Sequence, residues 1–86
     1  MTYSVFISKS AKKELKQIPV QYYVSIMEHI IALAEEPFPL GSKKLKNAQN
    51  IYRIRVGVYR IIYTVNNNEL IIDVIKIGHR KDVYDN

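Results

Sequence analysis

The sequence predicts an α+β protein, in which two N-terminal helices pack as a hairpin on one face of a small, mostly antiparallel four-stranded sheet. The predicted element order is β-α-α-β-β-β. Two observations support this class. Apolar residues recur at helical spacing between residues 11 and 34, whereas residues 2–7 and 51–56 alternate at the two-residue period of strands. The chain has 86 residues, enough for one domain over 1–86 and too few for two.

The N-terminal half is predicted to form one strand and two helices. Residues 2–7 are rich in β-branched and aromatic side chains, which favours a strand. Ser8 is suited to cap a short helix that ends before Pro19, and Pro19 fits the first turn of a second helix. Pro37 and Pro39 end that helix. Its expected apolar stripe comprises Tyr23, Ile26, Met27, Ile30, Ile31, Leu33 and Ala34.

The C-terminal half is predicted to be a loop followed by a three-stranded meander. Residues 40–50 have the composition of a loop. Strands over 51–56, 59–65 and 70–77 are separated by turns at Gly57 and at residues 66–68. The apolar run of the third indicates a strand that is central or well covered. The first strand is expected to join this sheet, since its backbone groups need partners. One sheet face is then left open, and Arg53 and Arg55 are expected to point from it into solvent.

Composition and charge exclude several classes of function. With no cysteine, the chain has no disulfides, thiolate metal sites or cysteine nucleophile, which agrees with a cytoplasmic setting. Neither a membrane span nor an export signal is found in the sequence. The net charge of +5 arises entirely in residues 43–86, which carry nine basic and four acidic residues. Such a block is typical of proteins that bind nucleic acid or an acidic partner, although a solvated surface has the same composition.

The basic residues and a late histidine and tyrosine are the best candidates for chemistry. His29 and His79 lack the spacing of metal ligands, so no metal and no cofactor is expected, and His29 is expected to have no role. Arg53 and Arg55 leave the same side of a strand, about 6.6 Å apart, and their guanidinium groups suit phosphate. Whether Arg60 shares their face depends on the hairpin register. The alternative for all three is a solvated strand surface.

Residues 78–84 bring an imidazole, a guanidinium and a phenol together after the last strand. His79 suits proton transfer near neutral pH, and a phenol can transfer a proton where neighbouring cations lower its pKa. With a base, an acid and cations for the phosphorane, an RNA strand can be cut by its own 2′-hydroxyl. His79 as a turn residue and Tyr84 as a core anchor remain open alternatives.

Residues 44–46, 52–63 and 77–84 together resemble the RelE branch of the RelE/ParE toxin superfamily of type II toxin–antitoxin systems. The resemblance implies a RelE-like fold and a metal-independent endoribonuclease (an mRNA interferase). Such a toxin cuts mRNA in the ribosomal A site by 2′-hydroxyl attack and thereby inhibits translation. Implied catalytic residues are Arg60, Arg80 and Tyr84, to which we add His79 as a candidate. The candidate RNA- and phosphate-binding residues are Arg53, Arg55, Lys43, Lys44, Lys46 and Lys81.

The resemblance also implies partners: a RelB-like antitoxin that wraps and inhibits the toxin, the ribosome with its mRNA, and operator DNA bound indirectly by the toxin–antitoxin complex. The chain departs from the family where relatives typically carry lysine, because guanidinium groups at 53 and 55 do not release protons. His79 or Tyr84 is therefore expected to transfer protons. Two alternatives stay open, a ParE-like inhibitor of DNA gyrase without nuclease activity and a non-catalytic nucleic-acid-binding module.

Overall fold

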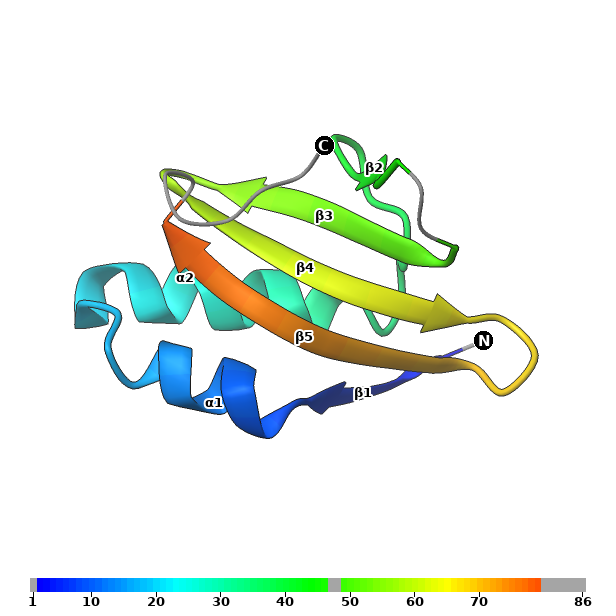
Figure 1. Cartoon of the computed structure of the whole chain (residues 1–86), viewed down its shortest axis with the longest axis horizontal. Helices are drawn as coiled ribbons and strands as arrows, with labels where there is room; N and C mark the ends of the chain where they lie inside the picture. The colour runs from blue at the N-terminus through cyan, green and yellow to red at the C-terminus, as the bar shows by residue number, and fades with distance from the viewer. Residues whose placement is uncertain (1, 47–48, 80–86) are drawn as a thin grey trace.

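The computed structural model describes residues 2–46 and 49–79. Two helices and five strands follow one another in this part of the chain, in the predicted order with one strand added (Figure 1). They are β1 (Ser4–Ile7), α1 (Lys9–Leu15), α2 (Val20–Ala32), β2 (Lys43–Lys44), β3 (Ile51–Val56), β4 (Tyr59–Asn66) and β5 (Ile71–His79).

The strands form one sheet in the order β1-β5-β4-β3-β2, in which β1 runs parallel to β5 and the other neighbours are antiparallel. The prediction that the first strand joins the sheet and that the last one is central is confirmed. The prediction of a loop over residues 40–50 is wrong at Lys43–Lys44, which pair with Arg53 and Tyr52. Two residues are too few to show a period, and exposed lysines are typical of edge strands.

Both helices begin close to their predicted caps. The Oγ of Ser8 accepts a hydrogen bond of 3.0 Å from the backbone N–H of Ala11, so that α1 starts at Lys9. Pro19 is the N-cap of α2. The predicted stripe of α2 is wrong at Ile31 and Tyr23, whose side chains are 64% and 39% exposed. Leu33 and Ala34 lie beyond the end of the helix at Ala32. Ile26 and Ile30 alone already direct one face of the helix into the core.

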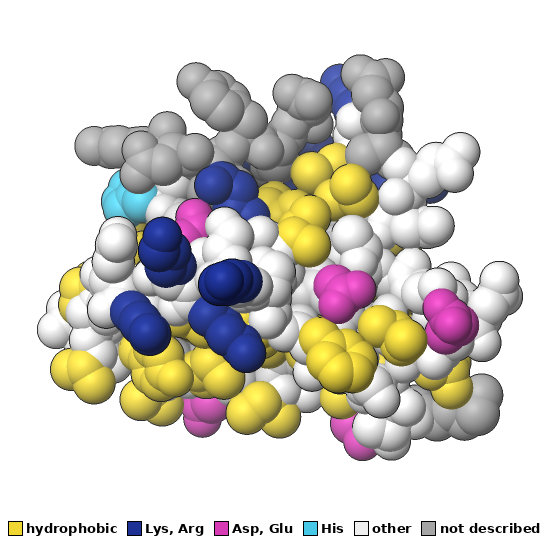
Figure 2. Space-filling view, turned by 60° about the horizontal axis from the view of Figure 1, so that its bottom comes forward, with side chains coloured by type: hydrophobic (Ala, Val, Ile, Leu, Met, Phe, Trp, Pro, Cys, Tyr) yellow, Lys and Arg dark blue, Asp and Glu magenta, His cyan; other side chains and the backbone are white. Residues whose placement is uncertain are grey.

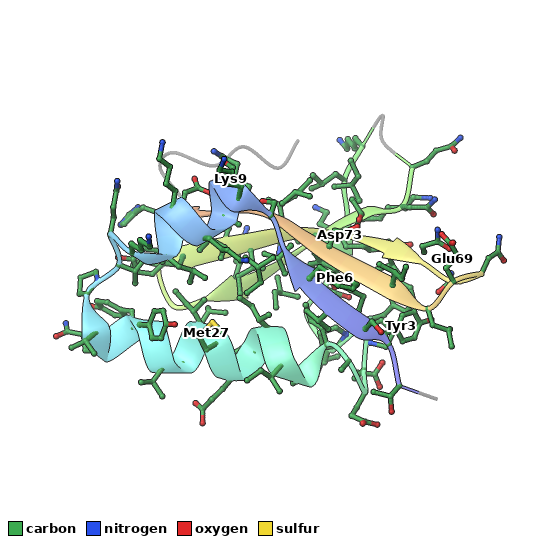
Figure 3. The ribbon with its side chains drawn as sticks, turned by 90° about the horizontal axis from the view of Figure 1, so that it is seen from below. Tyr3, Phe6, Lys9, Met27, Glu69 and Asp73 are labelled. Carbon is green, nitrogen blue, oxygen red and sulfur yellow. The ribbon has the colours of Figure 1, made fainter. Side chains whose placement is uncertain are left out.

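The two helices occupy different places. In Figure 3, which views the molecule from below, α2 lies on one side of the sheet, whereas α1 continues from β1 and lies along the β5 edge. The buried residues of α1, Ala11 and Leu15, nevertheless belong to the same hydrophobic core as those of α2. Among the described residues, no helix has the length and apolar character needed to cross a membrane.

The core lies between α2 and one face of the sheet. Its largest fully buried side chain is Tyr63, whose hydroxyl donates a hydrogen bond of 2.9 Å to the carbonyl of Pro37. Burial raises the pKa of Tyr63 to about 12, because the phenolate would lose its hydration. The core face of the three long strands is formed by Ile54, Val56, Ile61, Tyr63, Val65, Ile72, Val74 and Ile77.

Candidate nucleic-acid interface

The hairpin between β3 and β4 places two arginines side by side. Gly57 has a φ of +62°, a conformation that glycine adopts without strain, and it closes the turn so that Val56 pairs with Tyr59. In the resulting register Arg55 lies directly opposite Arg60. Directly opposed residues share a face, with Cβ atoms roughly 5 Å apart. The register that the sequence left undecided therefore joins Arg60 to the face of Arg55.

Arg60 also lies opposite Gly78 of β5, so the row across the three strands reads Arg55, Arg60, Gly78. Tyr59 and Val56, one position away, pack with the core on the other face. The arginine row therefore faces away from α2. The side chains of Arg55 and Arg60 leave neighbouring positions on this face. Two guanidinium groups within reach of one another suit a phosphate group, which accepts hydrogen bonds from both.

Arg53 differs from the prediction. It was expected to be solvated like Arg55, but its side chain is only 7% exposed. The additional strand β2 explains part of this, because Lys43 pairs with Arg53 and places it inside the sheet. Its neighbour on β4 is Ile62, which is also buried. Arg55, beyond the last residue paired with β2, keeps its exposed side chain.

A cavity of about 430 Å³ opens at the edge of β3 beside these arginines. The imidazole of His29, expected from the sequence to have no role, lies at its wall, with Nδ1 2.7 Å from the carbonyl oxygen of Ser25. None of the described lining residues is acidic, so the cavity extends the positive surface around the edge of the sheet. Its lining comprises His29, Pro39, Leu40, Gly41, Arg53, Ile54 and Arg55.

Apart from His79, the other predicted site residues are either exposed near β2 or lie outside the described part of the chain. Lys43, Lys44 and Lys46 are exposed on and beside β2, the strand next to β3. Arg80, Lys81 and Tyr84 lie outside the described residues. The basic segment that the sequence placed in a loop is thus held at the edge of the sheet by β2.

His79 is separated from the arginine row. It was expected to follow the last strand but is the final residue of β5, where it pairs with Tyr59. The two rings meet edge to face with centroids 5.8 Å apart, and Tyr59 in turn lies 5.4 Å from Tyr22 of α2. Because paired residues share a face, the His79 ring lies with Tyr59 on the helix side, and Arg60 on the other side.

A second basic surface was not predicted from the sequence. Lys9, Lys12, Lys13 and Lys16 are all exposed and recur at helical spacing along α1. Figure 2 shows these dark blue side chains gathered over α1. In the sequence, these four lysines are balanced by four glutamates within residues 1–42, so this half of the chain has no net charge. In the structure, however, Glu14, the one acidic residue of α1, bonds to β5. The sequence does not show that Glu14 turns away from these lysines, and the basic surface could therefore not be predicted.

The described site suits the binding of phosphates and the stabilisation of negative charge. Arginine stays charged at all physiological pH values and forms paired hydrogen bonds to phosphate oxygens. Within residues 2–46 and 49–79, no three His, Asp or Glu side chains lie close enough together to hold a metal ion.

Comparison with known proteins identifies the family. A family model described as "ParE toxin of type II toxin-antitoxin system, parDE" matches residues 5–84. The toxin RelE3 of Methanocaldococcus jannaschii is 36% identical over 94% of both chains. In the crystal structure of the RelE–RelB complex from Pyrococcus horikoshii, one chain is 34% identical, with a TM-score of 0.84 over 96% of this chain and 100% of that one.

The chain therefore belongs to the RelE/ParE toxin family of type II toxin–antitoxin systems. The relatives at 34–36% identity are RelE toxins. A chain of the Methanococcus jannaschii RelB–RelE complex is also similar, with 33% identity and a TM-score of 0.75 over 93% of this chain and 95% of that one. The α+β RelE-like fold predicted from the sequence is confirmed.

Proposed function

We propose that this chain is a RelE-type toxin that cuts mRNA in the ribosomal A site and so inhibits translation, as a single domain over 1–86. The observation that carries this is the pair formed by Arg55 and Arg60 on the face of the sheet that α2 does not cover. The relatives support the RelE branch, since those at 33–36% identity are RelE toxins.

In the proposed reaction the ribose 2′-oxygen attacks the adjacent phosphorus, the 5′-oxygen of the next nucleotide leaves, and a cyclic phosphate remains. Negative charge grows on the non-bridging oxygens of the phosphorane, where Arg55 and Arg60 would stabilise it. Guanidinium groups act here by charge and hydrogen bonding, because they do not release protons. No step in this scheme needs a metal ion or a cofactor.

Proton transfer is assigned to the segment after β5, with Arg80 as a further cation. Tyr84, as the phenolate, would take the proton of the attacking 2′-hydroxyl and then, as the phenol, give a proton to the leaving 5′-oxygen. His79 is left out of this set because its ring packs against Tyr59 on the opposite face of the sheet. We expect Tyr84→Phe to lose cleavage and His79→Ala to keep it. Loss of cleavage in a folded His79→Ala protein would return the proton-transfer role to the imidazole.

RNA binding is assigned to the basic groups around the arginine row. Arg53, Arg55 and the lysines of β2 would hold the message, together with Lys46 and Lys81. The lysines of α1 would contribute contacts to the larger RNA surface of the ribosome, because a cluster of exposed ammonium groups attracts a polyanion.

The proposed partner is a RelB-like antitoxin that covers the toxin and inhibits it in the cytoplasm. Two relatives that are 33–34% identical to this chain form complexes with RelB, which supports this assignment. The toxin–antitoxin complex would then contact operator DNA through the antitoxin.

The test is induced expression in a bacterial host, wild type beside Arg55→Ala/Arg60→Ala, with primer extension on an abundant mRNA. We expect breaks within translated codons for the wild type and none for the variant. The ParE description of the matching family model favours one alternative, inhibition of DNA gyrase. Growth arrest without mRNA breaks, together with loss of supercoiling activity, would support that alternative.

A further inference from the structure

Among the described residues, the C-terminal end of β5 has a strand neighbour on one side only. On that side β4 pairs Arg60 with Gly78 and Tyr59 with His79. On the other side β1 ends at Ile7, which pairs with Val74. The last five residues of β5 therefore extend past β1, and α1 occupies the space along this edge (Figure 3).

Side chains of α1 and its cap bond to this edge in place of a strand. Glu14 Oε1 accepts a hydrogen bond of 2.9 Å from the backbone N–H of Ile77, and Oε2 lies 3.3 Å from the ammonium of Lys76. The Ser8 hydroxyl donates a longer bond of 3.4 Å to the carbonyl of Ile75. Glu14 thus ties α1 to β5 at the residue just before Gly78.

We propose that Glu14 is a positioning residue of the arginine site, an inference that rests on the proposed function. Ile77 lies opposite Ile61, one position from the Arg60–Gly78 pair. Holding the Ile77 N–H therefore fixes the end of β5 against Arg60. Without an acceptor, this N–H loses its hydrogen bond and the strand end opens locally.

The two contacts of Glu14 contribute differently. The ion pair joins partly exposed side chains, 47% exposed for Lys76 and 28% for Glu14, and such pairs contribute little. The bond to the Ile77 N–H is partly buried, so its loss leaves a donor without an equally good partner. The positioning effect should therefore depend on the acceptor oxygen and hardly on the charge.

Three variants separate these contributions. Glu14→Ala removes both contacts, Glu14→Gln keeps an acceptor oxygen for Ile77, and Lys76→Gln removes the ion pair alone. Glu28→Ala is the matched control, an exposed glutamate on α2. All are measured in single-turnover cleavage of mRNA on programmed ribosomes, as a function of toxin concentration.

We expect Glu14→Ala to lower the cleavage rate at saturation about tenfold, with the half-saturating concentration within about twofold of the wild type. Glu14→Gln, Lys76→Gln and Glu28→Ala should stay within about threefold of the wild-type rate. A wild-type rate in Glu14→Gln would show that the acceptor oxygen matters and the charge does not. A lower rate at saturation with an unchanged half-saturating concentration would show an effect on positioning and not on ribosome binding.

Amide hydrogen exchange provides a readout independent of cleavage. In Glu14→Ala the amides of Ile77 and Gly78 should exchange faster, while that of Ile72 in the core keeps its wild-type rate. Equal cleavage by Glu14→Ala and wild type overturns the inference, as does faster exchange throughout the sheet, which would show a general loss of stability. A wild-type chain that cuts no mRNA overturns the proposed function and the inference with it.

Discussion

Replacing Arg60 by glutamine removes one of two directly opposed cations from the sheet while keeping a side chain of similar polarity. Arg60 faces Arg55 across the β3–β4 pair, with Cβ atoms roughly 5 Å apart. Two unit charges about 5 Å apart repel by about 0.8 kcal/mol in water, and this is an upper value because the guanidinium groups, at the ends of flexible side chains, can move further apart. Relief of this repulsion offsets the weaker packing of the shorter, half-buried side chain, so we expect the free energy of unfolding to change by at most about 1 kcal/mol.

Cleavage should change far more than stability, because the two cations repel each other in the free toxin but are both attracted to the phosphorane. Removing one preorganised donor from a developing oxyanion typically costs a factor of about 10² to 10³ in rate. The assay is single-turnover cleavage of labelled mRNA on programmed ribosomes at saturating toxin, beside a urea melt of each protein.

Lys76→Gln is the matched control, since it also removes one positive charge but from a side chain that lies beside Glu14. We expect its cleavage rate to stay close to that of the wild type. A folded Arg60→Gln protein that cuts within about threefold of the wild-type rate would refute the assignment of the arginine row. So would a loss of rate that Lys76→Gln reproduces, because it would reflect net charge alone.

Three further predictions concern the rest of the molecule. Lys12→Gln/Lys16→Gln should weaken ribosome binding and reduce the slope of log affinity against log salt by about 1 to 2, without changing the rate at saturation; an unchanged slope would exclude the α1 lysines from the interface. The neutral Tyr63 hydroxyl stabilises the fold fully below pH 10, and this contribution is lost as the pH rises toward the folded-state pKa of about 12. In urea melts, the free energy of unfolding of the wild type should therefore fall by about 2 to 3 kcal/mol more than that of Tyr63→Phe over this pH range. Equal losses in the two proteins would contradict the raised pKa of Tyr63. Ser8→Ala removes the cap of α1 and should destabilise the fold by about 1 kcal/mol in the same assay, whereas Ser10→Ala, an exposed position within α1, should have little effect.

The sequence by itself determined the elements that rest on local chemistry. Ser8 and Pro19 mark helix starts because capping and the proline ring act within a few residues. Gly57 marks the hairpin turn because few other residues adopt a positive φ there without strain. The alternating pattern likewise predicted that Arg55 leaves the sheet on the face opposite the core.

Tertiary structure decided which residues meet across strands, since a shift of one residue in register exchanges the two faces of a strand. The β3–β4 register joined Arg60 to Arg55, and the β4–β5 register placed His79 with Tyr59 on the other side. The strand β2, too short to show a period, brought Arg53 inside the sheet. In the sequence, Glu14 is only one of the charged residues of its helix. The packing of α1 against β5 brings it to the backbone N–H of Ile77, 63 positions away along the chain, a contact that only the tertiary structure determines.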